Sequence, residues 1–394
     1  MTFLVLHSSE YWGFYGHRMI NRMAVYTLPP EMMYLYKPHI DFITEHAVDP
    51  DKRRYASNFE ASRHYIDLDH WGFSPFDSLP RVWSDALLRF CDVIWISTTG
   101  DSLFFYGDEN WKRYFTEDSL EYSNQNMLLR QRDFPEFFSR FILTGYYEDS
   151  WEVDCALWRT YLGLTDTVPC EKVVIRDHLT EHGILPYHLK FMQSRLTKAF
   201  LEKDRSRIIR LSAEIGHYIG DAHVPLHTTS NYNGQLTDQL GIHAFWESRI
   251  PELFAEEQYD FFVGKAEYIS DPQSFFWNMV MESNSYVDSV LLIEKELSTV
   301  FPSDQQYCFD DRLNITVRTQ CEAYARAYQD RMQGLVEKRM RASIKAIGSS
   351  WYTAWVDAGQ PDFRRNSQVI NDLTEAEEDL IENHSKRIKG RVHE

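Results

Sequence analysis

Apolar residues recur at helical spacing over two long stretches of the chain. Between residues 187 and 222 they are three or four positions apart, as in Leu211, Ile215 and Ile219. This spacing places them on one face of an α-helix. The stretch 316–355 repeats the pattern and is rich in Ala, Arg, Glu and Met, which favour helices. Few segments alternate apolar and polar residues as strands do, so the pattern predicts an all-α fold.

Changes in residue composition along the chain predict its organisation. Residues 86–170 are rich in aromatic and acidic residues and poor in histidine, which indicates an insertion or subdomain within a helical domain spanning 12–362. The polar, charged segment 363–394 predicts a loose or helical tail. Segment 1–11 is interpreted as an extended N-terminus or the remnant of a signal peptide. Its apolar run, Phe3–Leu6, has no basic residue before it and no cleavage signature after it.

Composition and charge exclude several classes of protein. The 394 residues are 43% hydrophobic and 15% aromatic, which supports a large buried core. The formal net charge of −18 argues against stable binding to duplex DNA. Charged residues interrupt every apolar run before the roughly 18 residues needed to cross a bilayer. The five cysteines are widely spread without a CxxC motif, so neither a disulfide framework nor a cysteine zinc site is indicated.

Histidines and acids are spaced as in a metal site. His217 and Asp221 are four residues apart and share one face of the predicted helix. A proline then bends the chain before His227, and the pair His243 and Glu247 repeats the four-residue spacing. Neutral imidazole with carboxylate is a ligand set that zinc favours in hydrolytic sites. A lone histidine is usually a core residue, but two such pairs flanking a third histidine favour a metal site.

Three N-terminal fragments carry matching residue types. A glycine-punctuated segment places His17 five residues after Trp12. Segment 45–54 mixes acids with a basic cluster, and segment 63–70 offers histidines and acids beside an aromatic residue. Each fragment alone is equally consistent with a solvated surface.

Taken in order, these fragments resemble the superfamily of zinc-dependent phospholipases C and S-one/P-one type single-strand nucleases. The motifs are Trp12-Gly-x-x-Gly-His17, Asp49, His64-Tyr-Ile-Asp67, His217-x-x-x-Asp221 followed by His227, and His243-x-x-x-Glu247. The segment 217–227, with its Gly-Asp and Pro-Leu-His elements, is closer to the nuclease branch. The resemblance covers roughly residues 12–75 and 185–260.

The resemblance implies a multi-helical fold with three zinc ions in a cleft and a secreted or periplasmic protein. The first zinc would be held by Asp49, His64, His217 and Asp221. The second would be held by His227, His243 and Glu247. The third would be held by His17, Asp221 and the amino nitrogen and carbonyl oxygen of Trp12.

Two positions depart from the family pattern. The position of Glu247 is usually Asp in the family, which changes reach but not ligand chemistry. The family also uses Trp as its mature N-terminus, whereas Trp12 is internal here. An amide nitrogen cannot donate its delocalised lone pair to zinc. We therefore expect either cleavage before Trp12 or a weaker third site.

This ligand set is suited to hydrolysis of phosphodiesters. A metal pair bridged by Asp221 would lower the pKa of water towards neutrality. The adjacent cations Lys52 or Arg53 would stabilise the departing oxygen or the phosphate, unless they are ordinary surface charges. By resemblance, Tyr65 would stack a base and Asp67 would bond its edge. A core position for Tyr65, and a role for Asp67 in orienting a ligand, are the alternatives.

Three functions remain open at this point. The leading hypothesis is a zinc nuclease acting on single-stranded nucleic acid or nucleotides. The second is a phospholipase C acting on phospholipid headgroups, and the third is a helical binding protein with structural zinc. Structural zinc sites usually have four protein ligands, whereas the predicted site at His227 has three and leaves a position open. The sequence leaves the oligomeric state undetermined.

Overall fold

The structure, a computed structural model, describes residues 14–54, 59–98, 102–106, 115–116, 119–122, 127–129, 150–162, 170–312 and 315–364. The chain forms two compact units. Unit 1 combines the residues up to Pro75 with those from Ile184 onwards, and unit 2 spans Phe76–Gly183. The predicted N-terminal segment 1–11, Trp12, and the predicted tail beyond Arg364 lie outside the described residues.

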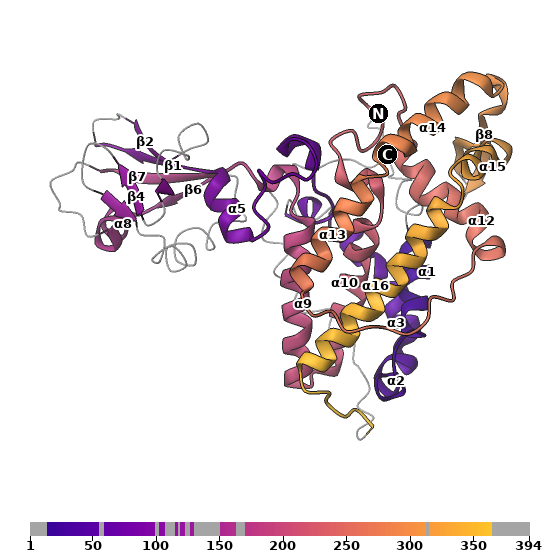
Figure 1. Ribbon diagram of the computed structural model, residues 1–394, viewed down its shortest axis with the longest axis horizontal. Helices are drawn as coiled ribbons and strands as arrows, with labels where there is room; N and C mark the ends of the chain where they lie inside the picture. Colours follow the sequence, from indigo (N-terminus) through magenta and orange to yellow (C-terminus); the bar gives the residue numbers. More distant parts are fainter. Residues whose placement is uncertain are drawn as a thin grey trace, which may run out of the picture. The chain divides into compact units, whose positions relative to one another are not determined.

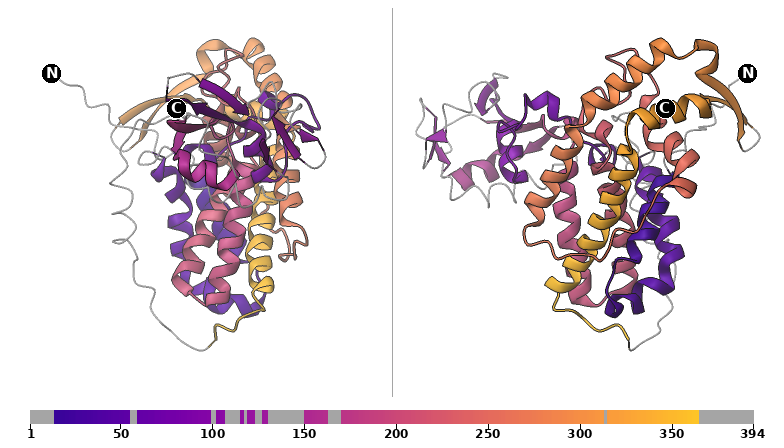
Figure 2. Two further views of the ribbon diagram at one scale, coloured as in Figure 1. Left: turned by 90° about the vertical axis from the view of Figure 1, so that its left-hand side faces the viewer. Right: turned by 45° about the vertical axis from the view of Figure 1, so that its right-hand side comes forward.

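The described chain is mostly helical, which confirms the helical class predicted from residue spacing. Figures 1 and 2 show the long helices of unit 1 lying side by side, with α1 packed against α10 and α16. The helices of unit 1 are α1 (Phe14–Val25), α2 (Pro30–Tyr36), α3 (Ile40–Glu45), α4 (Asp49–Arg53), α9 (Leu185–Glu202), α10 (Arg205–Ala222), α11 (Ile242–Ala244), α12 (Ile250–Gln258), α13 (Pro272–Asn284), α14 (Val287–Val300), α15 (Glu322–Arg331) and α16 (Leu335–Asp357). Short 3₁₀ turns include η3 (His46–Val48), η4 (Ala61–Arg63), η5 (Leu68–Trp71) and η9 (Pro225–Thr228).

The apolar stretch 187–222, predicted to be helical, lies in two helices. The break lies between α9 and α10, where Lys203 adopts a left-handed backbone conformation and the Asp204 side chain accepts a hydrogen bond from Arg207 N at 3.0 Å. An aspartate at this position caps the first turn of α10 by satisfying one of its free N–H groups. The stretch 316–355 is likewise divided, and its first residues form strand β9 instead of helix.

A buried core joins α10 and α16 within unit 1. Trp351 on α16 is fully buried, and its indole Nε1 donates to the Ser212 carbonyl of α10 at 3.0 Å. The Tyr36 hydroxyl lies 2.8 Å from the Ser212 hydroxyl. Because these buried polar groups are paired, the core stabilises the helix arrangement without leaving them unsatisfied.

Unit 2 contains the predicted insertion, 86–170, and includes strands that the sequence pattern does not predict. One antiparallel sheet has the order β2 (Ser102–Tyr106), β1 (Cys91–Ile96), β7 (Lys172–Asp177), β6 (Ser150–Val153). A second contains β3 (Phe115–Thr116), β4 (Ser119–Tyr122) and β5 (Met127–Leu129). Helices α5 (Trp83–Phe90) and α8 (Cys155–Leu162) belong to the same unit. In β7 burial alternates, with Val173 and Ile175 buried and Val174 partly exposed, but all three residues are apolar, so the sequence does not show the alternation of apolar and polar residues expected of a strand.

Two disulfides correct the interpretation of the cysteines. Cys155 pairs with Cys170 in unit 2, and Cys308 pairs with Cys321 at the hairpin of β8 (Tyr307–Arg312) and β9 (Ile315–Gln320) in unit 1. Cys91 is free and buried. Antiparallel pairing brings Cys308 opposite Thr319 and therefore near Cys321, a proximity that the linear spacing does not reveal. Disulfides are compatible with an extracellular protein.

The chain re-enters unit 1 beside one of the predicted ligand segments. Ile184 N donates to the Ser62 carbonyl at 2.8 Å, and Leu185 N donates to the Tyr65 carbonyl at 3.1 Å. These bonds anchor the start of α9 on either side of His64. Across the described residues, we find no helix that combines the length and apolar character needed to cross a membrane.

Candidate metal centre

Close approach of α1 to α10 brings the first predicted ligands together. His217 and Asp221 lie one turn apart on α10 and are fully buried. A Cβ atom on Gly220 would lie 2.8 Å from His17 Nδ1, and one on Gly216 would also collide with α1. The two glycines therefore provide the space in which His17 of α1 stacks on His217, with ring centroids 3.9 Å apart.

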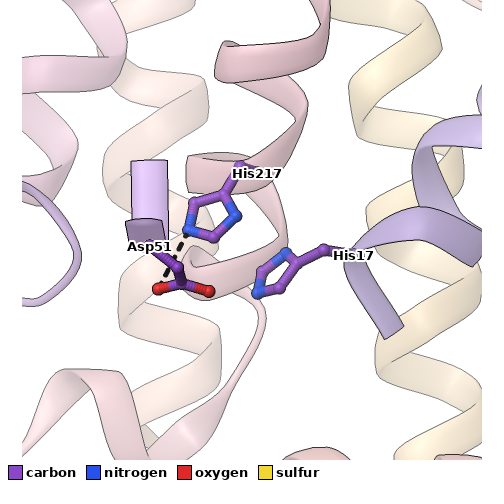
Figure 3. A group of neighbouring side chains, drawn as sticks. All are labelled: His17, Asp51 and His217. Atoms are coloured by element: carbon purple, nitrogen blue, oxygen red, sulfur yellow. Dashed lines mark ion pairs between the residues drawn. The ribbon is translucent and has the colours of Figure 1, made fainter. Parts of the chain in front are cut away.

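The first ligand group joins α10 to α4 and to the end of η4. His64 Nδ1 lies 3.1 Å from His217 Nε2 and 2.9 Å from Asp221 Oδ2. The Oδ1 atom of Asp51 lies 3.7 Å from both of these imidazole nitrogens. Figure 3 shows Asp51, His217 and His17 gathered from three helices around one small region.

The second group forms where the chain bends after α10. His227 lies on η9, and its carbonyl accepts a hydrogen bond from Ile66 N at 2.9 Å. His243 lies on α11, and Glu247 lies in the π-helical turn Phe245–Arg249 that separates α11 from α12. Glu247 Oε2 is 3.4 Å from His227 Nε2 and 2.7 Å from His243 Nε2. π-turns inside helices occur frequently at functional sites.

A third group connects the first two. His17 Nε2 lies 3.3 Å from Asp221 Oδ1 and 3.3 Å from Glu247 Oε1. Asp221 therefore takes part in the first and third groups, and Glu247 in the second and third. All of these side chains are buried except Asp51 and Glu247, which are partly exposed at 20% and 13%.

The spacing of these atoms fits the coordination shell of a metal ion. Two ligand atoms on a tetrahedral zinc with bonds of about 2.0–2.1 Å are about 3.3 Å apart. The nitrogen and oxygen pairs described above are 2.7–3.7 Å apart. The buried clusters could therefore hold a metal ion without large movement of the chain.

Backbone carbonyls orient two of the imidazoles. His217 Nδ1 lies 2.8 Å from the Ala47 carbonyl, and His243 Nδ1 lies 3.0 Å from the Tyr232 carbonyl. A carbonyl accepts only a proton, so each Nδ1 carries the hydrogen and each Nε2 presents a lone pair to the cluster. Such outer contacts fix the tautomer of a metal-binding histidine.

Burial and mutual charge set the protonation of the cluster. Burial raises the pKa of Asp221 and Glu247, but neighbouring imidazoles, including His217 for Asp221 and His17 for Glu247, outweigh this and hold both pKa values well below the ordinary range. Burial lowers the pKa of His17 and His64, but interactions with carboxylates, Asp221 foremost in both cases, outweigh this and raise both pKa values. The desolvated His217 has its pKa lowered to about 4. In the metal-free protein the acids thus favour the protonated forms of His17 and His64, and a divalent cation would compete with these protons.

Asp49 does not join the cluster in the structure, whereas Asp51 does. Asp49 Oδ2 contacts His46 Nδ1 at 2.5 Å, and Asp49 Oδ1 accepts a hydrogen bond from Lys52 Nζ at 3.0 Å. Two residues of helix correspond to a rotation of about 200°, so the carboxylates at positions 49 and 51 point in nearly opposite directions. Asp51 belongs to the acidic segment 45–54, but its position in the sequence did not indicate a role as a ligand.

The basic residues near α4 also differ from their predicted roles. Lys52 is half-exposed and pairs with Asp49. The Arg53 guanidinium is held by Glu214 at 3.0 Å and by other buried groups, so it does not face the ligands. Arg54, which sequence reasoning did not single out, places Nη1 3.4 Å from Asp51 Oδ1 and therefore lies at the edge of the cluster.

The predicted substrate contacts are both buried. Tyr65 and Asp67 are each 4% exposed. A ring that stacks an incoming base needs an accessible face, so the structure places Tyr65 as a core residue, the alternative considered from the sequence. Asp67 is equally inaccessible to a base edge. Trp12, the remaining predicted ligand, lies outside the described residues.

Comparison with known proteins identifies no relative. No family model, curated protein or solved structure matches the chain. The function must therefore be inferred from the chemistry of the cluster and from the motif order.

Proposed function

We propose that this chain is a zinc-dependent phosphodiester hydrolase. The observation that supports it is the buried cluster in which Asp221 and Glu247 are each shared between two ligand groups. A shared carboxylate holds two cations close together, which is the arrangement used to clamp a phosphoryl group during in-line displacement.

The ligand chemistry and the motif order favour three zinc ions. Imidazole nitrogen and carboxylate oxygen suit zinc, and each of the three groups described above supplies at least three such atoms. His17, Asp51 and His217 form a fourth group, which overlaps the first and the third. The first ion would be held by His64, His217, Asp51 and Asp221. The second would be held by His227, His243 and Glu247, and the third by His17, Asp221 and Glu247.

Zinc and the residues around it would have separate roles in hydrolysis. Zinc bound here would supply a nucleophile at neutral pH by lowering the pKa of water, and positive charge for the phosphate. Asp221 would fix the relative positions of the first and third ions. Arg54 would replace Lys52 and Arg53 as the proposed cation, because it is the guanidinium beside Asp51 and can form charge-assisted bonds to a phosphate. The His227 group, with three protein ligands, would leave a coordination position open for substrate.

Single-stranded nucleic acid or nucleotide is the proposed substrate. The spacing between His217 and His227 supports the nuclease branch, and net charge of −18 is consistent with local capture of a phosphate by metal and Arg54 rather than by a basic surface. Phospholipid is the alternative, favoured by the burial of Tyr65, which removes the expected base-stacking ring. A non-catalytic zinc protein is a third possibility, opposed by the three-ligand His227 group.

Metal analysis followed by parallel assays tests the proposal. Purified protein would be stripped, reloaded with zinc and assayed on single-stranded DNA, RNA and phosphatidylcholine. We expect near three zinc per chain and cleavage of single-stranded substrates. Cleavage of phosphatidylcholine alone would establish the phospholipase alternative. Zinc binding without turnover of any phosphodiester would refute the hydrolase proposal and favour structural zinc.

A further inference from the structure

A buried carboxylate lies directly behind His64. Glu60 precedes η4 and is 1% exposed. Its Oε1 atom lies 3.7 Å from His64 Nε2, on the side of the ring that faces away from the ligand cluster. It belongs to none of the candidate ligand groups among the described residues.

The charge of Glu60 is fixed in place by three donors. Arg63 Nη1 donates to Oε2 at 2.9 Å, and Arg53 Nε donates to the same oxygen at 3.4 Å. The Tyr218 hydroxyl donates to Oε1. A carboxylate removed from water is costly unless it is paired in this way, so its presence beside His64 calls for a reason beyond packing.

His64 presents Nδ1 to the cluster, unlike the other imidazoles described above. Its Nδ1 lies 2.9 Å from Asp221 Oδ2 and 3.1 Å from His217 Nε2. For Nδ1 to offer its lone pair to a cation, the ring proton must be on Nε2. His64 Nε2 is buried and makes no hydrogen bond in the described structure. Glu60 Oε1 lies about 0.5 Å beyond hydrogen-bonding range, so a small ring movement would pair them.

We propose that Glu60 is a positioning residue that accepts the Nε2 proton of His64 and thereby directs Nδ1 to the metal. At His217 and His243 a backbone carbonyl performs this function, and at His64 a carboxylate does. Arg53 and Arg63 act indirectly by holding Glu60 in place. The inference rests on the proposed metal centre and adds a specific ligand atom and a specific partner to it.

The test compares Glu60→Gln with Glu214→Gln. Glu214 pairs with Arg53 at 3.0 Å, so its substitution disturbs the same ionic network without removing the group behind His64. Zinc affinity would be measured on stripped protein by competition with a chelator. We expect Glu60→Gln to lose about 10–100-fold in affinity at one site and Glu214→Gln to lose little. Glu60→Asp, which keeps the charge, should recover part of the loss.

Two further measurements separate positioning from a general structural role. In a His64→Ala background, Glu60→Gln should cause no additional loss of zinc affinity, because Glu60 acts through His64. With ¹⁵N-labelled histidine and bound cadmium, one-bond coupling should appear at His64 Nδ1 in the parent protein. Circular dichroism of each stripped variant shows whether it is folded.

These measurements distinguish failure of the positioning role of Glu60 from failure of the proposed metal centre. A folded Glu60→Gln protein with unchanged affinity at every site would overturn the positioning role while leaving the metal centre intact. The same holds if the His64→Ala background leaves the full effect of Glu60→Gln, or if cadmium couples to Nε2 of His64. A parent protein that binds no metal would refute the metal centre itself, and the role of Glu60 with it.

Discussion

Replacement of Gly220 with alanine tests whether the contact between α1 and α10 positions the cluster. A Cβ atom at this position would lie 2.8 Å from His17 Nδ1 and 2.8 Å from Ile20 Cδ1. The Ile20 methyl can rotate aside. The His17 ring cannot, because it stacks on His217 and its Nε2 faces two carboxylates. We therefore expect either α1 or the ring to move away from the ligand positions.

The expected change in the free energy of unfolding is the difference between the gain in helix propensity and the cost of overpacking. Alanine in place of glycine within a helix stabilises it by about 1 kcal/mol. Overpacking a buried contact costs about 1–3 kcal/mol. Gly220→Ala should therefore lower the free energy of unfolding by up to about 2 kcal/mol, and should weaken zinc binding by roughly the 10–100-fold typical of changes to contacts outside the ligand set.

Gly16→Ala is the matched control. Gly16 lies on α1 beside His17, and a Cβ atom there would meet only the Glu247 carbonyl, at an ordinary 3.7 Å. This variant should keep its zinc affinity and its stability, or gain slightly in stability. Thermal unfolding of the stripped proteins and chelator competition would be measured side by side. If Gly220→Ala matched Gly16→Ala in both measurements, the steric argument would be wrong.

Three further predictions concern the ligands. Asp51→Asn should weaken zinc binding more than tenfold, whereas Asp49→Asn should leave it nearly unchanged; equal effects in chelator competition would contradict the placement of α4. Asp221→Ala should lower the bound zinc by more than one ion per chain and abolish any metal-dependent hydrolysis, since two ligand groups lose a carboxylate. A folded variant with full zinc content and activity would refute the proposal that Asp221 is shared between two ions. Zinc affinity should rise with pH through neutrality and level off above the raised pKa values of His17 and His64, because protons on these imidazoles in the stripped protein must leave before metal binds. Isothermal titration calorimetry in several buffers would also detect the released protons. A zinc affinity that does not change with pH, without proton release, would oppose this assignment.

Residue spacing predicted the helices of unit 1 because their large apolar residues recur every three or four positions. In α10 the period of three to four residues can be seen in the sequence although nearly all of the helix from Leu211 onwards is buried, because the other buried positions include small and polar residues such as Gly216 and His217. In strand β7 the burial alternates, but the partly exposed Val174 is as apolar as its two buried neighbours, so the period of two residues cannot be seen in the sequence. The disulfide between Cys308 and Cys321 depends on the register of a hairpin, which spacing does not give.

The candidate site was predictable where ligands lie on one helix and less so elsewhere. His217 and Asp221 meet because four residues complete about one turn. The choice between Asp49 and Asp51 depends instead on which way a short helix faces, and two residues reverse that direction. Glu60 carried no motif at all, because its importance comes from burial behind His64 and not from its position in the chain.

Unit 2 interrupts unit 1 in the sequence without supplying any of the proposed ligands. Every proposed ligand lies in unit 1, with His17, Asp51 and His64 before the insertion and the others after it. The hydrogen bonds of Ile184 and Leu185 to the segment around His64, together with the packing of α1 on α10, join the two parts without the intervening polypeptide. A single nick inside unit 2 should thus yield complementing fragments that stay associated and reconstitute the centre, one supplying three side chains and the other the rest.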